Sequence, residues 1–227
     1  QSGEIAPILL RARLLQALDR GPEALPLLRK AIRDNPDDKR LRLTYARTLV
    51  EQDRIADAKG EFLSLVQQYP EDDELRYSLA LVCLENKDWD EAESYLQELV
   101  ERDSNTDAAH LNLGRIREER HDPAGALREY ALVGPGPDYL AAQLRQADIL
   151  IANGRGTEAS RLLAEAREAQ PEQAIQLYLI ESESYSNNNK DAQANQVLQQ
   201  AIQRYPDDLN LLYTRAMLAE KRNDLTQ

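Results

Sequence analysis

A pattern of small and large apolar residues that repeats about every 34 residues constrains the fold of this 227-residue chain more than any other feature. Each copy has a small residue, a large apolar residue four positions later, and a small or apolar residue three positions after that. The six copies are Ala24-Leu28-Ala31, Ala58-Phe62-Leu65, Ala92-Leu96-Leu99, Ala126-Tyr130-Val133, Ala159-Leu163-Ala166 and Ala194-Leu198-Ala201. Residues at this spacing share one face of a helix, so six amphipathic helices are expected.

A second small residue lies about twelve positions before each copy and predicts a first helix that packs closely against the second. These residues are Ala12, Ala46, Ala80, Gly114, Ala147 and Ser182, and Ala216 marks a seventh unit. The pattern is clearest in residues 73–106, where two apolar helical segments flank the polar turn 85–88. A single helix pair cannot cover both of its apolar faces, so the pairs are expected to stack on one another.

Polar segments inside the units predict the turns between paired helices. They are residues 21–23, 52–54, 85–88, 121–123, 153–156 and 186–190. The strongest break is Gly134-Pro135-Gly136-Pro137, where the fourth unit lacks the usual end of its second helix. We expect residues 5–137 to form units one to four, and residues 138–227 to form units five and six with the first helix of a seventh. A flexible hinge and a rigid kink at 134–137 are both compatible with the sequence.

The repeat resembles the tetratricopeptide repeat (TPR) from about Ile5 to the end of the chain. The period matches, since Pro36 and Pro70 are 34 residues apart, and the most specific segments are residues 87–92 and Leu113-Gly114. The resemblance implies an all-α, right-handed TPR solenoid of antiparallel helix pairs, with about six complete repeats. Because the chain begins without methionine and ends after the first helix of a seventh unit, we expect a fragment of a longer array.

The charge distribution argues against nucleic acid as a partner. The net charge is −12, and residues 71–107 alone contain thirteen acidic side chains against three basic ones. Such a surface repels phosphate backbones. We interpret the acidic stretch as a solvated outer face that keeps an extended array soluble.

Cysteine content and hydropathy leave the cellular compartment open. Cys83 is the only cysteine and lies on an apolar helix face, so it is expected to be a core thiol rather than half of an internal disulfide. No apolar run is long enough for a membrane span, and no signal peptide or lipidation signal is present in these residues.

The sequence contains none of the common catalytic signatures, such as His-Glu-x-x-His, Gly-x-Ser-x-Gly, a phosphate-binding glycine loop or paired Cys-x-x-Cys. His110 lies at a helix-packing position and His121 in a turn, so neither has metal-ligand spacing. We therefore expect a protein that is not an enzyme and that has no catalytic residues, metal or cofactor.

A surface remains as the candidate site, because the first helices of TPR proteins line a groove that holds a partner segment. One set of matching positions is apolar throughout and comprises Leu9, Leu43, Tyr77, Leu111, Leu144, Leu179 and Tyr213. A second set lies one helical turn further along the same face and comprises Arg13, Arg47, Leu81, Arg115, Asp148, Glu183 and Met217. The second set is basic in the N-terminal half and acidic in the C-terminal half.

Two interpretations of these positions remain open. In the first, they form a protein-binding groove whose arginines favour acidic groups and whose tyrosines act as anchors. In the second, the apolar residues pack against neighbouring first helices and are only half exposed. The carboxylate clamp found in some TPR proteins is not matched, because Leu9 and Leu43 replace the expected polar groups.

Overall likeness also extends to the long TPR lipoproteins of the pseudomonad outer membrane. This resemblance implies an adaptor that binds a carboxyl-terminal processing protease in the periplasm and presents cell-wall hydrolases to it. The lipid-attachment cysteine of such proteins is absent from these residues, so anchoring would require a missing N-terminus. The alternatives are a periplasmic or cytoplasmic assembly scaffold and a co-chaperone-like peptide-binding module.

Overall fold

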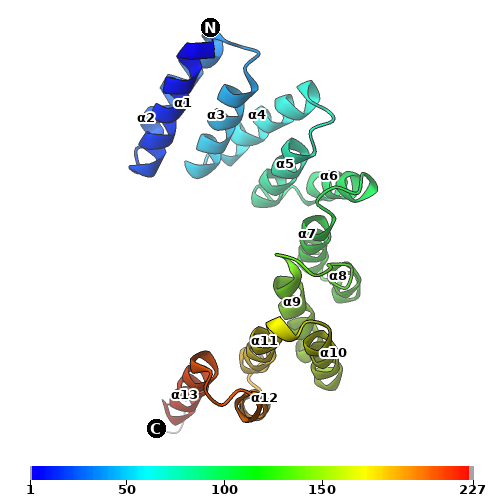
Figure 1. Ribbon diagram of the computed structural model, residues 1–227. Helices are drawn as coiled ribbons and strands as arrows, with labels where there is room; N and C mark the ends of the chain where they lie inside the picture. The colour runs from blue at the N-terminus through cyan, green and yellow to red at the C-terminus, as the bar shows by residue number, and fades with distance from the viewer. Residues whose placement is uncertain (1, 225–227) are drawn as a thin grey trace. The chain divides into compact units, whose positions relative to one another are not determined.

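The computed structural model describes residues 2–224 and, from residue 5 to residue 220, their side chains. These residues form α-helices and one short 3₁₀ helix, with no strand among them, which confirms the all-α class (Figure 1). The helices are α1 (Ser2–Ala17), α2 (Gly21–Asp34), α3 (Lys39–Glu51), α4 (Ile55–Gln68), α5 (Asp73–Glu85), α6 (Trp89–Glu101), α7 (Thr106–Glu119), α8 (Pro123–Tyr130), α9 (Tyr139–Ala152), α10 (Gly156–Ala169), η1 (Pro171–Gln173), α11 (Ala174–Asn187), α12 (Asp191–Arg204) and α13 (Leu209–Asp224).

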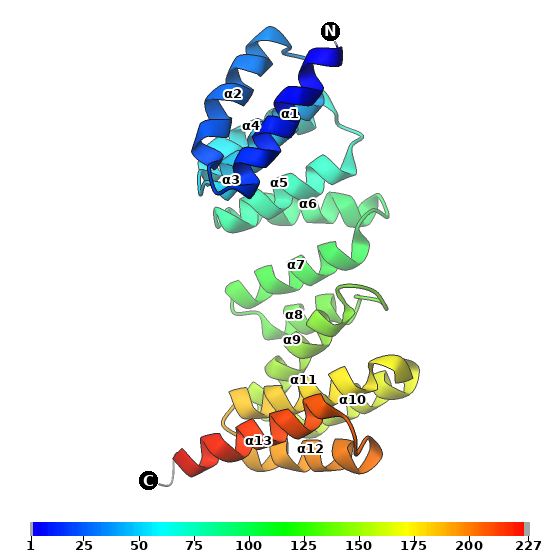
Figure 2. The ribbon, with the colours of Figure 1, turned by 60° about the vertical axis from the view of Figure 1, so that its left-hand side comes forward.

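The chain divides into two compact units, one ending at Ala109 and the other beginning at His110. In the first unit α1 pairs with α2, α3 with α4, and α5 with α6. In the second unit α9 pairs with α10 and α11 with α12 (Figure 2). A turn of three residues joins the members of each pair, so the paired helices run antiparallel. The division falls within α7.

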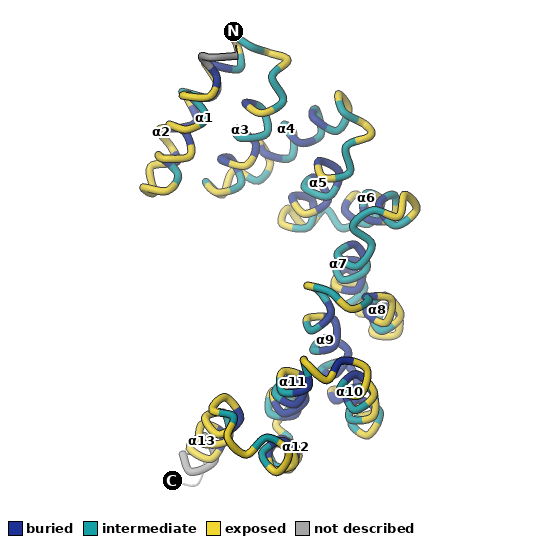
Figure 3. Tube along the Cα trace, viewed as in Figure 1, coloured by how far each residue is buried: buried dark blue, intermediate teal, exposed yellow. Residues whose placement is uncertain are grey.

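Burial confirms the predicted repeat register. The small residues that open the six copies, from Ala24 to Ala194, are all fully buried, and every other member of the pattern is at most 6% exposed. Figure 3 shows that α8, α10 and α12 also carry exposed residues on the side away from the first helices. Burying one large apolar side chain contributes about 1.5–3 kcal/mol, so the register is strongly specified.

The turns inside the units repeat in backbone geometry as well as in sequence. Each has one residue with a positive φ, and these residues are Asp19, Asp53, Lys87, His121, Gly154 and Asn189. The prediction that residues 21–23 form the first turn is wrong, because α2 begins at Gly21 and the turn is residues 18–20. Pro22 lies in the first helical turn, where its missing N–H has no helical partner to lose.

The first-helix small residues allow the predicted close packing. Those from Ala12 to Ser182 are all buried, whereas Ala216 on α13 is exposed. The approach is close at Gly114, where a Cβ atom would lie 2.4 Å from a ring carbon of Tyr130. Alanine at this position would therefore force α7 and α8 apart.

The fourth unit differs from the others, as the sequence predicts. Its second helix, α8, has 8 residues, whereas the other second helices have 13 or 14. Gly134–Pro137 follows in the loop before α9 and lies inside the second compact unit. Whether this segment is a hinge or a rigid kink stays a prediction.

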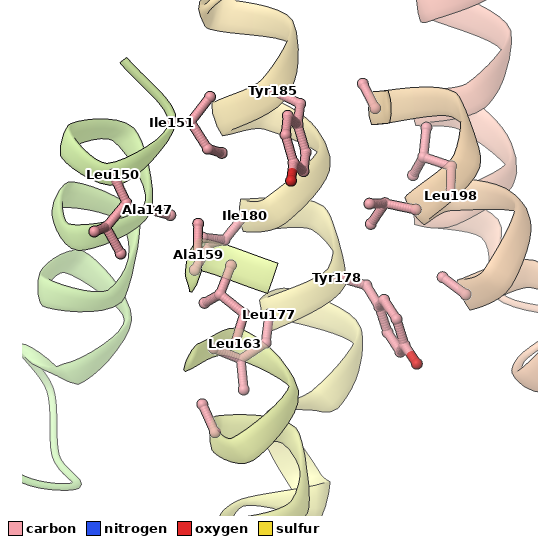
Figure 4. Packing of buried hydrophobic residues seen from close by; sticks show 14 of the residues in the cluster. Ala147, Leu150, Ile151, Ala159, Leu163, Leu177, Tyr178, Ile180, Tyr185 and Leu198 are labelled. Carbon is pink, nitrogen blue, oxygen red and sulfur yellow. The ribbon is translucent and has the colours of Figure 1, made fainter. Parts of the chain in front are cut away.

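Two apolar clusters hold the second unit together. The larger joins α9, α10, α11 and α12 through Leu150, Leu163, Leu177 and Leu198 (Figure 4). The smaller is built around Tyr130, with Ala126, Val133, Ala142 and Ile149. The larger cluster includes Leu177, Ile180 and Tyr185 and so holds α11 in place.

Many charges of the acidic stretch are paired within the first unit rather than merely solvated. Arg76 is 6% exposed and donates to Asp73 at 2.5 Å, to Glu98 at 2.9 Å and to the carbonyl of Pro70 at 2.6 Å. Lys59 donates to Asp88 at 2.5 Å and to Glu91 at 2.9 Å. The Arg76 contacts join α5 to α6 and the Lys59 contacts join α4 to the start of α6, so the acidic stretch also has a structural role.

Cys83 is the buried core thiol that the sequence predicts. It is fully buried on α5. Desolvation raises the pKa of its thiol to about 11, although the Lys59 ammonium opposes this shift. The thiol is therefore neutral at physiological pH, which makes it a poor nucleophile.

Candidate protein-binding surface

The predicted groove residues lie on the first helices of the repeats, and their exposure follows the two sets. In the apolar set, Leu9, Leu43, Tyr77, Leu111, Leu144 and Leu179 are half-buried and Tyr213 is exposed. In the second set, Arg13, Arg47, Leu81, Arg115, Glu183 and Met217 are exposed and Asp148 is half-buried. The second set is therefore the more accessible part of the surface.

The apolar set contributes to packing while it keeps some surface open. Leu144 and Leu179 pack against the larger apolar cluster, and Leu111 packs against the smaller one. This double role matches both interpretations of the sequence. The assignment of these residues to a binding groove stays a prediction.

Two arginines in the first unit present unneutralised charge. Among the described residues, Arg13 on α1 and Arg47 on α3 form no ion pair or hydrogen bond through their side chains, and both are exposed. Arg115 in the second unit donates to the amide oxygen of Asn112 at 3.3 Å. The first-unit arginines are thus free to meet an acidic group.

Asp148 differs from its basic counterparts because part of its carboxylate is buried. Burial raises its pKa, and the nearby Ser184 hydroxyl and Arg145 guanidinium only partly offset this effect. Asp148 Oδ1 and Ser184 Oγ are both buried, and neither has a partner in hydrogen-bonding geometry among the described residues. Asp148 therefore weakens packing between helices more than it offers a charge to a partner.

The second unit contains a cavity of about 480 Å³ between α11 and α13. Three predicted groove residues meet there: Leu179, Glu183 and Met217. The rest of the wall comprises Ser182, Ser186, Asn187, Thr214 and Leu218. The walls are mainly apolar, with hydroxyl and amide groups at intervals and one exposed carboxylate.

The sequence did not single out the polar members of this cavity as site residues. Ser182 was expected to serve only close packing, and Ser186 and Asn187 to serve only the turn. They lie three, seven and eight residues after Leu179, which is the helical spacing of a shared face. One further helical turn after Glu183 reaches Ser186 and Asn187, and Ser182 lies directly before Glu183.

The structure gives the two histidines local roles. His110 Nδ1 lies 2.9 Å from a carboxylate oxygen of Glu129, and His121 is the positive-φ residue of its turn. Within the described part of the chain, no group of three or more His, Cys, Asp or Glu side chains could hold a metal ion. None of the helices described is long and apolar enough to cross a membrane.

Comparison with known families identifies the class of protein. A family model described as tetratricopeptide repeat matches residues 15–82 and 62–116, and a second model with the same description matches residues 144–208. The chain belongs to the tetratricopeptide-repeat family. Proteins built from this repeat are generally non-catalytic scaffolds for protein–protein interactions.

A similar protein is known from Pseudomonas aeruginosa. It is described as TPR repeat-containing protein PA4667 and is 63% identical over 224 residues, which cover 99% of this chain. The matched region is 38% of that protein, so the chain spans less than half of its relative's length.

Several solved structures share the fold. A tetratricopeptide repeat protein from Parabacteroides merdae matches with a TM-score of 0.64 and 13% identity over 96% of this chain and 86% of its own. Pseudomonas aeruginosa pilF matches with a TM-score of 0.58 and 17% identity, covering 93% of this chain and 96% of its own. YrrB, described as a TPR protein with an unusual peptide-binding site, matches with a TM-score of 0.51 and 17% identity. The match covers 83% of this chain and 97% of YrrB.

Proposed function

We propose that this protein is a non-catalytic adaptor that binds a periplasmic processing protease and presents cell-wall hydrolases to it. The cavity between α11 and α13 carries the binding part of this proposal, because three groove residues line it together. The resemblance to outer-membrane TPR lipoproteins supports the adaptor part, and so does the 63% identity to a pseudomonad TPR protein. Localisation in the periplasm, through a lipid anchor outside these residues, belongs to the same proposal.

The cavity suits an apolar side chain with a basic neighbour. Leu179, Met217 and Leu218 offer apolar contact, while Glu183 is exposed and has no ion pair among the described residues. A lysine or arginine beside the apolar anchor would therefore be attracted to Glu183. Such a segment could belong to either the protease or a hydrolase.

Holding protease and substrate on one chain would accelerate cleavage without chemistry by the adaptor. Linked binding sites raise the effective concentration of one partner near the other, to the millimolar range for short flexible connections. An assembly scaffold unrelated to proteolysis is the alternative, and the peptide-binding site named for the structurally similar YrrB favours binding of a segment in either case.

A reconstituted degradation assay tests the proposal. A processing protease and a cell-wall hydrolase are incubated with and without the protein, and loss of intact hydrolase is followed on gels. We expect at least a tenfold faster loss with the protein present. Unchanged turnover, with the hydrolase or the protease still retained on the immobilised protein, would overturn the adaptor function and leave the scaffold.

Substitutions at two exposed residues test whether the cavity is the binding site. Glu183→Lys and Met217→Asp alter the cavity wall, whereas Glu220→Lys and Leu209→Asp make matching changes at exposed positions that do not line the cavity. The cavity variants should lose capture of the partner and the controls should keep it. Equal retention by all four variants would remove the cavity from the proposal.

A further inference from the structure

A second cavity, of about 350 Å³, lies on another side of α11 and has a different chemical character. Its walls come from α10, η1, the start of α11 and the end of α12. They comprise Ala164, Arg167, Glu168, Pro171, Ala174, Tyr178, Arg204 and Tyr205. No residue is shared with the cavity between α11 and α13.

The two tyrosines and two arginines are organised by stacking. The guanidinium carbon of Arg167 lies 4.0 Å from the ring centroid of Tyr178, and that of Arg204 lies 5.9 Å from the centroid of Tyr205. The two rings meet edge to face, with centroids 6.4 Å apart. These contacts hold the rings of Tyr178 and Tyr205 in fixed orientations in the cavity wall.

The two arginines differ in how their charge is balanced. Arg167 donates to Glu181 at 2.7 Å, and the side chains of this pair are only 11% and 4% exposed. Arg204 has no carboxylate within ion-pair distance among the described residues and is exposed. Arg204 is therefore the cation of the cavity that has no ion-pair partner among the described residues.

Further donors also remain unused. The hydroxyls of Tyr178 and Tyr205 make no hydrogen bond within the described part of the chain. In Figure 4 the Tyr178 hydroxyl points away from the buried cluster. The only carboxylate on the wall is that of the exposed Glu168.

We infer that this cavity is a second binding site and takes the carboxylate of a glutamate or aspartate side chain from a partner protein. The guanidinium of Arg204 and the tyrosine hydroxyls supply the donors, and charge-assisted bonds of this kind are stronger than neutral ones. Pro171, Ala174 and the tyrosine rings offer apolar contact to the methylene groups of the ligand side chain. The site is separate from the groove and does not depend on the proposed adaptor function.

The probe is the capped peptide acetyl-Gly-Glu-Gly-Glu-Gly-amide, titrated into the whole chain and followed by the arginine Nε–Hε signals in NMR spectra. The Arg204 signal, assigned by its loss in Arg204→Gln, should shift and saturate. The same peptide with glutamine in place of glutamate should leave it unmoved. Shifts of equal size with the glutamine peptide, or no saturation with the glutamate peptide, would overturn the proposal.

Matched variants, followed by amide signals around the cavity, sharpen the test. Arg204→Gln should raise the dissociation constant at least fivefold and Tyr205→Phe about twofold, whereas Glu168→Gln should lower it about twofold. Arg161→Gln removes one exposed positive charge from α10 outside the cavity and should change nothing, as should Met217→Asp in the groove. Equal weakening by Arg161→Gln would show only general charge attraction and would contradict a built site.

A third peptide separates two sources of carboxylate. Acetyl-Gly-Gln-Gly-Gln-Gly with a free C-terminus carries only the terminal group. Saturation by this peptide alone, without saturation by the capped glutamate peptide, would assign the site to a chain terminus and overturn the side-chain proposal.

Discussion

The two compact units treat the same position of the repeat differently. Arg76 in the first unit and Tyr178 in the second each precede a predicted groove residue, Tyr77 and Leu179 respectively. Arg76 is buried, and its donors reach two carboxylates and a carbonyl. Tyr178 is also buried, but it meets Arg167 through its ring and leaves its hydroxyl unused.

This difference shows how a repeat can become a binding site without a change of fold. Where a cation occupies the position, helix junctions are closed by ion pairs from within the chain. Where Tyr178 occupies it, its ring stacks on Arg167, which pairs with Glu181, and Arg204 on the neighbouring Tyr205 has no ion-pair partner among the described residues. The same helix arrangement therefore yields a contact bridged by ion pairs in one unit and a cavity with aromatic walls in the other.

The largest loss of stability is expected from breaking the buried ion pair between Arg167 and Glu181 in the second unit. Glu181→Ala leaves Arg167 without its carboxylate in a site where its side chain is only 11% exposed. Breaking a buried ion pair costs about 3 kcal/mol because the remaining charge is unpaired. Urea unfolding, with hydrogen exchange in α10 and α11, would measure the loss.

Glu183→Ala is the control for this change, since it lies on the same helix but is exposed. Its effect should stay within about 0.5 kcal/mol. If the two variants unfold at the same urea concentration, the Arg167–Glu181 pair does not stabilise the contact between α10 and α11.

A smaller loss is expected from Arg76→Met in the first unit. Methionine keeps most of the apolar stem, but Glu98 and the Pro70 carbonyl lose their donor. Because Asp73 keeps Arg102 at 2.7 Å and Glu98 is 47% exposed, the expected cost is about 2 kcal/mol rather than the full penalty of a buried pair. Arg47→Met, at an exposed and unpaired arginine, is the control. If the urea midpoint of Arg76→Met shifts no more than that of Arg47→Met, the Arg76 network does not stabilise the contact between α5 and α6.

The repeat itself could be predicted from the sequence, whereas the junction chemistry could not. The period places each helix and buries Leu28, Tyr130 and Leu198, because helical spacing alone decides which face is apolar. The contact between Arg167 and Tyr178 joins residues on different helices, and the spacing says nothing about the side-chain conformations that bring them together. The same limit hid Glu181, which the sequence shows only as an acid between the apolar Ile180 and the polar Ser182.

The structure brings three of the predicted groove residues together for a related reason, while their assignment to a binding groove stays a prediction. Leu179, Glu183 and Met217 line one cavity because their helices, α11 and α13, are neighbours within one unit. Asp148 was expected to add acidity to this surface, but its burial depends on how closely α11 packs against α9. That distance is a property of the packed pair and cannot be calculated from the repeat period.

The two units should also differ in how one buried or paired aspartate, Asp148 or Asp88, makes stability depend on pH. Burial raises the pKa of Asp148, so ionisation of Asp148 destabilises the fold as pH rises through the folded-state value. Asp148→Asn should therefore be more stable than the parent by about 1 kcal/mol at pH 7, because the neutral amide removes the partly buried charge that the site satisfies poorly. The advantage should vanish below about pH 4, the ordinary range of an aspartate in an unfolded chain.

Asp88 in the first unit should show the opposite sign. Hydrogen bonds from Asn86 and Lys59 lower its pKa, so its ionised form stabilises the fold above the unfolded-state value and this contribution is lost as pH falls through the folded-state value. Asp88→Asn should be less stable than the parent at pH 7 and equal to it in strong acid. Urea midpoints of both variants and the parent between pH 2.5 and 7.5 would test these opposite effects. If both variants shift the midpoint in the same direction at pH 7, the contrast between the units is wrong.

The smallest difference in stability is expected between phenylalanine substitutions at two tyrosines on α11, Tyr185 and Tyr178. Tyr185 places its hydroxyl 2.9 Å from that of Ser160 and donates to the carbonyl of Gly156 at 3.0 Å, so Tyr185→Phe should cost about 1 kcal/mol. Tyr178→Phe keeps the ring against Arg167 and Tyr205 and removes only the unused hydroxyl, so its stability should change by less than about 0.5 kcal/mol. Urea unfolding of the two variants side by side makes the measurement. An equal loss from both would mean that the Tyr178 hydroxyl already stabilises the fold, as the donors of Arg76 do in the first unit.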